Sequence, residues 1–313
     1  MILKKIFAYS FIYLVLLFLY LPVFVLIAFS FTNSANLGIW NGFSFDLYTA
    51  LFKDSEIMIA VGNTLIIAVI SAVVATVLGT LGAIGTFYSK KRTRGVIEGL
   101  TQIPVVNAEI VMALSLTVMF VFLGSYVFRS SLFSFWTLLI GHVCLAVPFV
   151  YLNVKPKLMQ MDPSLYEAAL DLGATPRRAL TRIVVPQILP GIASGFLLSI
   201  TLSLDDFIIT AFTRGPGLLN GEGQIETLST LVQAKIKKGP IPPELRALTT
   251  IIFIIVLMIV LIRSLKINFK KKESKHLKKR KAFSQATNER AYYRNTSSNS
   301  ISINLSKEEK KND

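Results

Sequence analysis

Long apolar stretches, interrupted by short polar segments, fill most of this chain. A helix that crosses a membrane needs about 20 mainly apolar residues. Six stretches reach that length, and they cover residues 6–31, 62–88, 100–124, 133–154, 188–213 and 247–265. No segment between them is long enough to form a soluble domain with its own core. The pattern therefore predicts an all-α polytopic membrane protein with six transmembrane helices.

The composition agrees with this prediction. The chain of 313 residues is 53% hydrophobic and only 16% charged, whereas soluble domains carry about 25% charged residues. A charged side chain costs about 2.5–3.5 kcal/mol at the centre of a membrane helix, so charge is expected between the apolar stretches, where it is found. The one cysteine, Cys144, permits no disulfide bond within the chain and no cysteine-based metal centre. We therefore expect neither a metal nor a cofactor.

Lysine and arginine residues indicate the orientation, because loops on the cytoplasmic side of a membrane are rich in them. With the N-terminus inside, the inner segments are 1–5, 89–99, 155–187 and the C-terminal tail, and they hold most of the basic residues. The outer loop at 214–246 is the exception, because it holds five basic residues that three glutamates partly balance. The pattern favours an N-in, C-in orientation.

The chain divides near residue 265, into a six-span membrane domain, 1–265, and a basic tail, 266–313. The tail holds 14 of the 33 lysine and arginine residues and 5 of the 18 acidic ones, and it supplies +9 of the net charge of +15. A segment of this composition cannot bury enough apolar surface to fold alone, and its basic start is expected to lie against anionic membrane lipid. A nucleic-acid-binding protein would instead present basic residues on a folded face, so we expect no nucleic-acid partner.

Small residues recur every four positions in the second apolar stretch. They are Ser71, Ala75, Gly79 and Ala83. Small side chains at this spacing let membrane helices approach closely. The stripe predicts a tightly packed bundle and says nothing about a substrate.

The longest predicted inner loop, 155–187, contains signals for two short helices. A proline after a capping residue starts a helix, and a glycine often ends one. These signals are Asp162–Pro163, Gly173 and Thr175–Pro176. Each short helix has an apolar side, which can pack against the protein's own helix ends or against a separate cytoplasmic protein, and the residue pattern leaves both possibilities open.

The same loop resembles the EAA loop of ABC importer permeases. The resemblance rests on Glu167–Ala169, Gly173 and Ile183–Pro186, in which Val185 takes the place of the family's leucine. It implies the type I ABC importer permease fold and a coupling loop that contacts an ABC ATPase subunit dimer. The residues that it implies for this contact are Glu167, Ala168, Ala169, Gly173 and Pro186.

The chain has no Gly-x-x-x-x-Gly-Lys-Ser/Thr loop of the kind that holds nucleotide phosphates. It therefore does not supply that type of ATP site itself. We expect a transport subunit without catalytic residues, driven by a partner that hydrolyses ATP.

Three acidic residues interrupt the apolar stretches, namely Glu109, Asp205 and Asp206. Ionisable residues inside a membrane helix are costly and often mark functional sites. Within the six stretches the one basic residue is Arg263, near the end of the last, so the acids have no obvious basic partner. Each acid alone can be protonated, or hydrogen-bonded to a nearby serine, threonine or asparagine. The three together favour an anionic path for a cation.

The depths of the acids favour an extended cation. A rise of about 1.5 Å per residue puts Glu109 near the middle of its helix and Asp205 in the outer half of its own. Neighbouring residues point about 100° apart, so Asp205 and Asp206 are not expected to face the path equally. Phe207 beside them can add a cation–π contact. His142 can be a packed, hydrogen-bonded residue or a proton relay.

Further segments resemble the second permease of the spermidine/putrescine importers. They are Glu109–Ala113, Leu202–Phe207, Gly215–Gly217 and Gly239–Thr250, and the resemblance covers about residues 5–265. It implies polyamine transport in a complex with a similar second permease, an ABC ATPase dimer and an extracytoplasmic polyamine-binding protein. The residues expected along the substrate path are Glu109, Asp205, Asp206 and Phe207.

Other functions are open on the pattern alone. An ABC importer permease for an amino acid, iron or another small solute would share the coupling loop, although an anion would require basic residues deep in the membrane. An ion-driven carrier would be expected to show repeat symmetry, which is not evident. A membrane enzyme would need a facing catalytic pair, which the adjacent Asp205 and Asp206 do not form.

Overall fold

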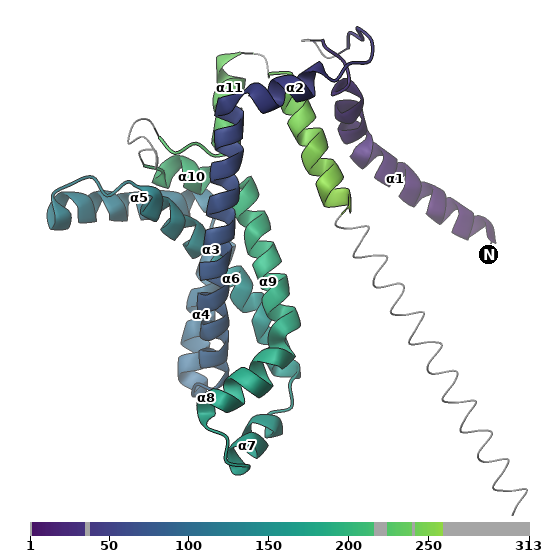
Figure 1. The fold of residues 1–313 in the computed structure, drawn as a ribbon. Coiled ribbons are helices and arrows are strands. Elements are labelled where there is room, and N and C mark those ends of the chain that lie inside the picture. The colour runs from purple at the N-terminus through teal and green to yellow at the C-terminus, as the bar shows by residue number, and fades with distance from the viewer. Residues whose placement is uncertain (1, 35–37, 216–223, 240–241, 259–313) are drawn as a thin grey trace, which may run out of the picture. The chain divides into compact units, whose positions relative to one another are not determined.

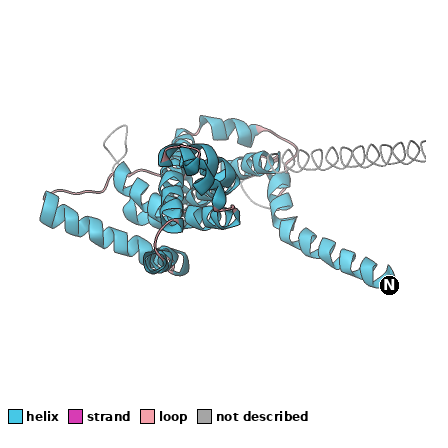
Figure 2. Ribbon diagram, turned by 90° about the horizontal axis from the view of Figure 1, so that it is seen from below, coloured by secondary structure: helices cyan, strands magenta, loops and turns pink. Residues whose placement is uncertain are grey.

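The computed structural model of the protein describes residues 2–34, 38–215, 224–239 and 242–258. The regular elements of these ranges are helices, as Figure 2 shows, which confirms the predicted fold class. In chain order they are α1 (Ile2–Phe29), α2 (Asp46–Lys53), α3 (Ser55–Phe87), α4 (Lys91–Val106), α5 (Glu109–Phe122), the π-helical turn η1 (Leu123–Phe128), α6 (Phe135–Gln160), α7 (Ser164–Asp171), α8 (Pro176–Ala179), the π-helical turn η2 (Leu180–Val184), α9 (Val185–Asp205), α10 (Ile208–Thr213) and α11 (Leu228–Lys238). The last described helix covers residues 244–258.

The described residues divide into two units. One holds α1 as far as Ala28 together with residues 246–258, and the other runs from Phe29 to Leu245. Every candidate site residue belongs to the second unit, so this unit is the one that positions the site.

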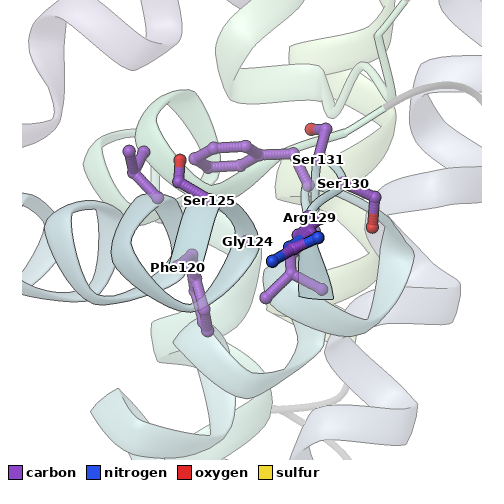
Figure 3. A pocket seen from close by; sticks show the side chains of 9 residues that line it. Phe120, Gly124, Ser125, Arg129, Ser130 and Ser131 are labelled. Atoms are coloured by element: carbon purple, nitrogen blue, oxygen red, sulfur yellow. The ribbon is translucent and has the colours of Figure 1, made fainter. Parts of the chain in front are cut away.

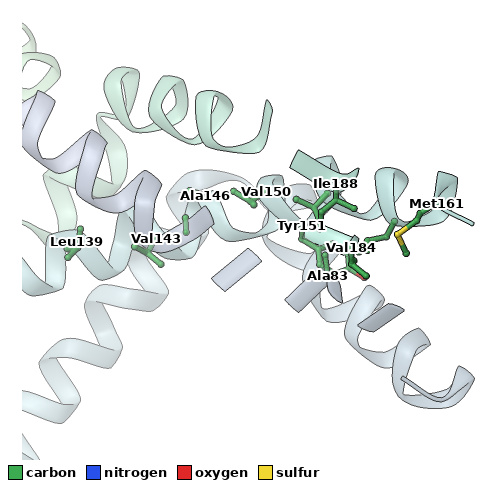
Figure 4. Packing of buried hydrophobic residues seen from close by; sticks show 12 residues of the cluster. Ala83, Leu139, Val143, Ala146, Val150, Tyr151, Met161, Val184 and Ile188 are labelled. Carbon is green, nitrogen blue, oxygen red and sulfur yellow. The ribbon is translucent and has the colours of Figure 1, made fainter. Parts of the chain in front are cut away.

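Helices α3, α6 and α9 form the centre of the second unit, where each packs against the other two and runs alongside them (Figure 1). Figure 4 shows the buried apolar side chains that fill this centre and extend to Met161 at the end of α6 and to Val184 of η2. These side chains are Ala75, Ala83, Leu139, Val143, Ala146, Val150, Tyr151, Val154, Leu158, Met161, Val184 and Ile188.

The small residues of α3 permit this close packing. A Cβ atom added to Gly79 would lie 2.7 Å from the Cβ of Val150 on α6. On α9, a Cβ added to Gly195 would lie 3.1 Å from the Cα of the same valine. The predicted stripe is buried along its whole length, at Ser71, Ala75, Gly79 and Ala83. Its role as a helix-packing surface is therefore confirmed.

Five helices are long and apolar enough to cross a membrane, and they correspond to the first five predicted stretches. They cover Tyr9–Phe29, Ser55–Phe87, Glu109–Phe128, Phe135–Gln160 and Pro176–Asp205. Apolar side chains on their outer sides, such as Val77, Leu81 and Val118, are exposed, as lipid-facing side chains are. The sixth stretch, 247–265, is described as helix as far as residue 258, and its remainder and the tail at 266–313 lie outside the described residues.

Within the second unit, the predicted inner segments 89–99 and 155–187 lie together. Figure 1 shows α7 and α8 at one end of the bundle, and α2 and α11 at the other. At the α7 end, Glu98 of α4 forms ion pairs with Lys155 of α6 at 2.8 Å and with Arg94 at 2.9 Å. The ammonium of Lys155 and the guanidinium of Arg94 hold the pKa of the Glu98 carboxyl below its usual range. The two basic inner segments are thus joined to each other, while the N-in, C-in orientation stays a prediction.

The third stretch differs from the prediction of a single helix over 100–124. The chain forms α4 as far as Val106 and starts α5 at Glu109. The two residues between them are extended, with ψ of 145° at Asn107 and 136° at Ala108. Hydropathy does not reveal this break, because the residues on both sides of it are apolar.

A larger side chain at position 79 should destabilise the bundle. We expect Gly79→Val to lower the midpoint of thermal unfolding of the detergent-purified protein, because overpacking a tight core costs about 1–3 kcal/mol. Gly85→Val, on the same helix, is the matched control, because no atom lies within 4 Å of a Cβ at that position. Equal midpoints for the two variants would contradict the packing that the structure shows.

Candidate functional site

Two helices of the second unit are broken, and the three predicted acids lie at the breaks. Glu109 is the first residue of α5, after the break that follows α4. Asp205 is the last residue of α9, and Asp206 follows it in extended conformation before α10 begins. Glu109 therefore lies at a helix end and not mid-helix as expected, and the fifth stretch, 188–213, is two helices rather than one.

Packing of α5 against α10 brings the two breaks into the same region. The Thr117 hydroxyl of α5 donates a hydrogen bond to the carbonyl oxygen of Phe212 at 3.1 Å. Ala113 of α5, Leu145 of α6 and Ile209 of α10 form a buried apolar cluster beside this bond. These contacts between α5 and α10 join the break at Glu109 to the break at Asp205 and Asp206.

Glu109 and Asp205 are exposed and sit at opposite kinds of helix end. The N-terminus of α5 carries partial positive charge and stabilises the carboxylate of Glu109. The C-terminus of α9 carries partial negative charge from its unpaired carbonyl groups, which adds to the charge of Asp205. A cation bound there would interact favourably with both the carboxylate and the helix end, as in transporters with broken helices.

Asp206 differs from the other two acids because its carboxylate is buried and already has donors. The residue is 5% exposed. Its Oδ1 accepts a hydrogen bond from the Ile209 N–H at 3.2 Å, and its Oδ2 accepts from the N–H and the hydroxyl of Thr210 at 2.9 and 3.0 Å. These bonds cap the N-terminus of α10. Asp206 therefore has little capacity left to bind a solute.

A chain of buried polar side chains leads from α3 to Asp206. The hydroxyl oxygens of Ser71 and Ser203 are 3.3 Å apart, and the Ser203 oxygen lies 2.8 Å from Nδ1 of His142. Nε2 of His142 lies 3.0 Å from the hydroxyl oxygen of Thr210 and 3.7 Å from Oδ2 of Asp206. The chain thus connects α3, α9, α6 and α10 at the second break.

The hydrogen bonds of this chain have a consistent direction. Because the Thr210 hydroxyl donates to Asp206, it accepts from the Nε2–H of His142. Nδ1 of the neutral imidazole is then the acceptor for the hydroxyl of Ser203. Every donor meets an acceptor in this arrangement, which matches the packed, hydrogen-bonded role considered for His142 rather than a proton relay.

Phe207 lies directly after Asp206 and is half-buried. It is the residue before α10, and its carbonyl oxygen accepts a hydrogen bond from the Ala211 N–H at 2.9 Å. Its ring therefore belongs to the same break as the acids.

Helix α11 contacts the second break from the other side, in a way that the sequence pattern did not reveal. The Ser229 hydroxyl donates to the backbone oxygen of Asp206 at 2.6 Å. The Leu228 N–H donates to the hydroxyl of Thr64 at 2.8 Å, and the ammonium of Lys235 lies 2.9 Å from Glu56. Charge was the one signal of this loop in the residue pattern. The cap at Asp206 was recognisable, because an aspartate often accepts a hydrogen bond from the N–H three residues later at the start of a helix.

Two cavities do not include the three acids, and each has one arginine in its lining. A cavity of about 500 Å³ lies between the end of α5, η1 and the loop that precedes α6 (Figure 3). Its charged lining residue is Arg129, and a second cavity, of about 410 Å³, contains Arg214. Neither cavity has an acidic lining residue. The helix breaks, and not these cavities, are therefore the candidate site for a cation.

The predicted coupling loop forms α7 and α8 at the end of the bundle opposite α11 (Figure 1). Gly173 ends the first of these helices as predicted, with a left-handed φ of 83°. Its N–H donates to the carbonyl oxygen of Leu170 at 2.9 Å, and the Ala174 N–H donates to that of Ala169 at 3.0 Å. This is the Schellman arrangement, in which glycine is favoured because it adopts positive φ without strain.

The candidate coupling residues do not all lie on the surface. Ala169 is 5% exposed and faces the protein, and the ring of Tyr166 lies 4.9 Å from that of Tyr88 at the end of α3. Leu172 is 89% exposed, which is unusual for a leucine. The other candidates are exposed, namely Glu167, Ala168, Gly173 and Pro186. One side of the loop therefore packs on the bundle, which is the first possibility considered, and the other side is uncovered, so contact with a separate protein stays a prediction.

The second short helix predicted to begin at Thr175–Pro176 is not separate from the fifth predicted stretch, and Pro186 lies within the continuous helix. Helix α8 continues through η2 into α9, and Pro176–Asp205 is one helix of 30 residues. Proline lacks the N–H that a helix hydrogen bond needs, and the π-helical turn directly before α9 accommodates it by shifting the bonding pattern. The coupling loop and the acids of the second break are therefore the two ends of the same helix.

The sequence is similar to those of known transport proteins. Residues 75–273 match the family described as binding-protein-dependent transport system inner membrane component. The spermidine/putrescine transport system permease protein PotC of Escherichia coli K12 is 35% identical over 245 residues, which are 78% of this chain and 87% of that protein. The protein of the same name from Haemophilus influenzae is 33% identical over 257 residues, 82% of this chain and 94% of that protein. The putrescine transport system permease protein PotI of E. coli K12 is 35% identical over 236 residues, 75% of this chain and 81% of that protein.

The fold also resembles a solved structure. A chain of a bacterial ABC transporter involved in the import of the acidic polysaccharide alginate superimposes with a TM-score of 0.64. The match covers 83% of this chain and 92% of that one, at 19% sequence identity. The chain therefore has the type I ABC importer permease fold.

The different environments of the two adjacent aspartates predict different effects on stability. We expect Asp206→Ala to lower the midpoint of thermal unfolding, because losing a helix N-cap costs about 0.5–2 kcal/mol. Asp205→Ala is the matched control and should leave the midpoint nearly unchanged, because Asp205 is exposed. A larger loss for Asp205→Ala would contradict the assignment of Asp206 as the cap.

Proposed function

The chain belongs to the family of binding-protein-dependent transport system inner membrane components, and we propose that its solutes are the polyamines spermidine and putrescine. It is a multi-pass protein of the inner membrane and a permease subunit of an ABC importer. Two sets of relatives that it matches at 35% identity are named for spermidine/putrescine and putrescine transport. These names support the proposed solute class.

The observation that carries the solute class is the pair of exposed acids, Glu109 and Asp205, at neighbouring helix breaks. A polyamine carries several protonated amines along a flexible apolar chain. Carboxylates from two helices can each contact one amine, and the carbonyl end of α9 can accept hydrogen bonds from the amine beside Asp205. Phe207 can contribute a cation–π contact.

The site described here is suited to passage rather than to storage. A transport site must bind its solute well enough to admit it and weakly enough to release it. Glu109 and Asp205 are exposed, so each interaction with an amine is weakened by solvent screening. Asp206 contributes to the path through its backbone and charge, because its side chain is occupied by α10.

Energy for transport comes from a separate subunit. Members of the family work with an ATPase, a second permease and an extracytoplasmic binding protein. In this chain we assign the ATPase contact to the exposed side of α7 and the following turn, at Glu167, Ala168, Leu172 and Gly173. The binding protein would deliver polyamine at the α11 end of the bundle. The permease itself forms and breaks no covalent bond.

The continuous helix from Pro176 to Asp205 supplies a route from the ATPase to the solute. At about 1.5 Å per residue it spans on the order of 45 Å. When two ATPase subunits close on ATP, they move the coupling loops. Because α8 and α9 are one rigid element, that movement reaches the break at Asp206 directly and changes access to Asp205.

Loss of either exposed acid should weaken polyamine recognition. We expect Asp205→Asn and Glu109→Gln each to raise the apparent KM for labelled spermidine about tenfold, because a hydrogen bond to a charged group contributes about 1.5–3 kcal/mol. Uptake is measured with the complete importer in membrane vesicles. Asp46→Asn, an exposed acid on α2, is the control and should transport as the unmodified protein does. An unchanged KM in both site variants would refute the cation path.

Coupling to the ATPase should depend on the shape of the loop at Gly173. We expect Gly173→Val to reduce ATP hydrolysis stimulated by the loaded binding protein about fivefold, because a left-handed backbone costs a residue with a side chain about 1–2 kcal/mol. Gly173→Asn is the matched variant, because asparagine tolerates this conformation, and it should retain most of the stimulation. Equal activity of the valine and asparagine variants would show that the turn does not matter for coupling.

A further inference from the structure

His142 connects the two sides of the second helix break. Its Nδ1 lies 2.8 Å from the hydroxyl of Ser203, two residues before the end of α9. Its Nε2 lies 3.0 Å from the hydroxyl of Thr210 on α10. One imidazole on α6 therefore holds one side chain from each flank of the break.

The bonds made by His142 differ in kind from those that cap α10. The cap bonds from Ile209 and Thr210 to Asp206 stay within one short segment and move with it. Only a group on another helix can set the angle between α9 and α10. Because α10 packs on α5, that angle sets how Asp205, the last residue of α9, lies relative to Glu109, the first residue of α5.

Helix α6 is a rigid support for this purpose. His142 is 1% exposed, and Thr210 is completely buried. A Cβ atom added to the neighbouring Gly141 would lie 2.6 Å from Cγ2 of Ile209 and 3.2 Å from the hydroxyl of Thr213. Helix α10 is thus pressed directly against α6 beside the imidazole.

We propose that His142 is a positioning residue for the cation site, which acts by bridging Ser203 and Thr210 and so directs Asp205 toward the solute. The proposal rests on the proposed polyamine function. It assigns to His142 no contact with the solute and no proton transfer. It predicts that the imidazole matters through one donor and one acceptor held at fixed positions.

Four variants of the complete importer test this, with labelled spermidine uptake as the readout. His142→Leu removes both hydrogen bonds, whereas His142→Gln keeps one donor and one acceptor on a side chain of similar length. Thr210→Val removes the hydroxyl between His142 and Asp206. Thr213→Val is its matched control on the same helix, because the Thr213 hydroxyl is equally buried and bonds only the carbonyl oxygen of Ile209 in its own helix.

We expect His142→Leu and Thr210→Val to raise the KM for spermidine about tenfold, the effect of leaving a buried polar group without its partner, while the maximal rate stays near that of the unmodified importer. His142→Gln and Thr213→Val should keep a KM close to the original value. Rescue by glutamine is the result that a mere space-filling role would not produce.

Three results would overturn the proposal. One is a KM for His142→Leu no higher than that for Thr213→Val, another is equal impairment of the leucine and glutamine variants, and the third is a lowered maximal rate at unchanged KM. If His142→Leu does not assemble, the comparison of Thr210→Val with Thr213→Val decides alone. Failure of the polyamine function itself would show differently, as an absence of saturable spermidine uptake by the unmodified importer or an unchanged KM for Asp205→Asn.

Discussion

The buried carboxylate of Asp206 is the interaction on which the arrangement of the site depends. A charged group in a low-dielectric interior is tolerated only when several donors surround it. Here the donors are two backbone N–H groups and one hydroxyl, all from the start of α10. Meeting this requirement obliges the chain to stop one helix at Asp205 and start another at Ile208. The break leaves the carboxylate of Asp205 and the carbonyl end of α9 available to a solute.

The same break lies at the end of a continuous helix of 30 residues in the second unit. That helix begins beside the coupling loop at Pro176 and ends at Asp205. Gly195 allows this helix to lie close against α6, because a Cβ atom added there would lie 3.1 Å from the Cα of Val150. Close packing of this kind resists bending, which supports our proposal that a push at one end is delivered at the other. The tightly packed residues and the acid at the break thus belong to the same helix.

Much of this could be predicted from the residues alone. Five of the six apolar stretches correspond to helices of membrane-spanning length. Hydropathy predicts them well because every bilayer penalises polar groups that lack a hydrogen-bond partner in its core. The helix end at Gly173 was predictable as well, because it depends on local backbone sterics. The errors concern what happens inside apolar runs. Hydropathy does not report the helix breaks after Val106 and Asp205 or the continuous helix through Pro186. These features depend on packing partners that are distant in sequence.

The sequence by itself determined the number and type of the spans described, the loop with the EAA pattern and the presence of three acids among apolar residues, because these follow from composition and local spacing. The tertiary structure decided the surroundings of each acid. Asp205 and Asp206 are neighbours of identical chemistry, yet one is exposed and the other is 5% exposed and fully hydrogen-bonded. The difference arises partly from His142, which is 64 positions before Asp206 in the sequence yet is linked to it through the hydroxyl of Thr210. It also arises from the surface of α6 that packs against α10. Contacts of this kind come from helices that meet only in the folded bundle, and no local pattern encodes them.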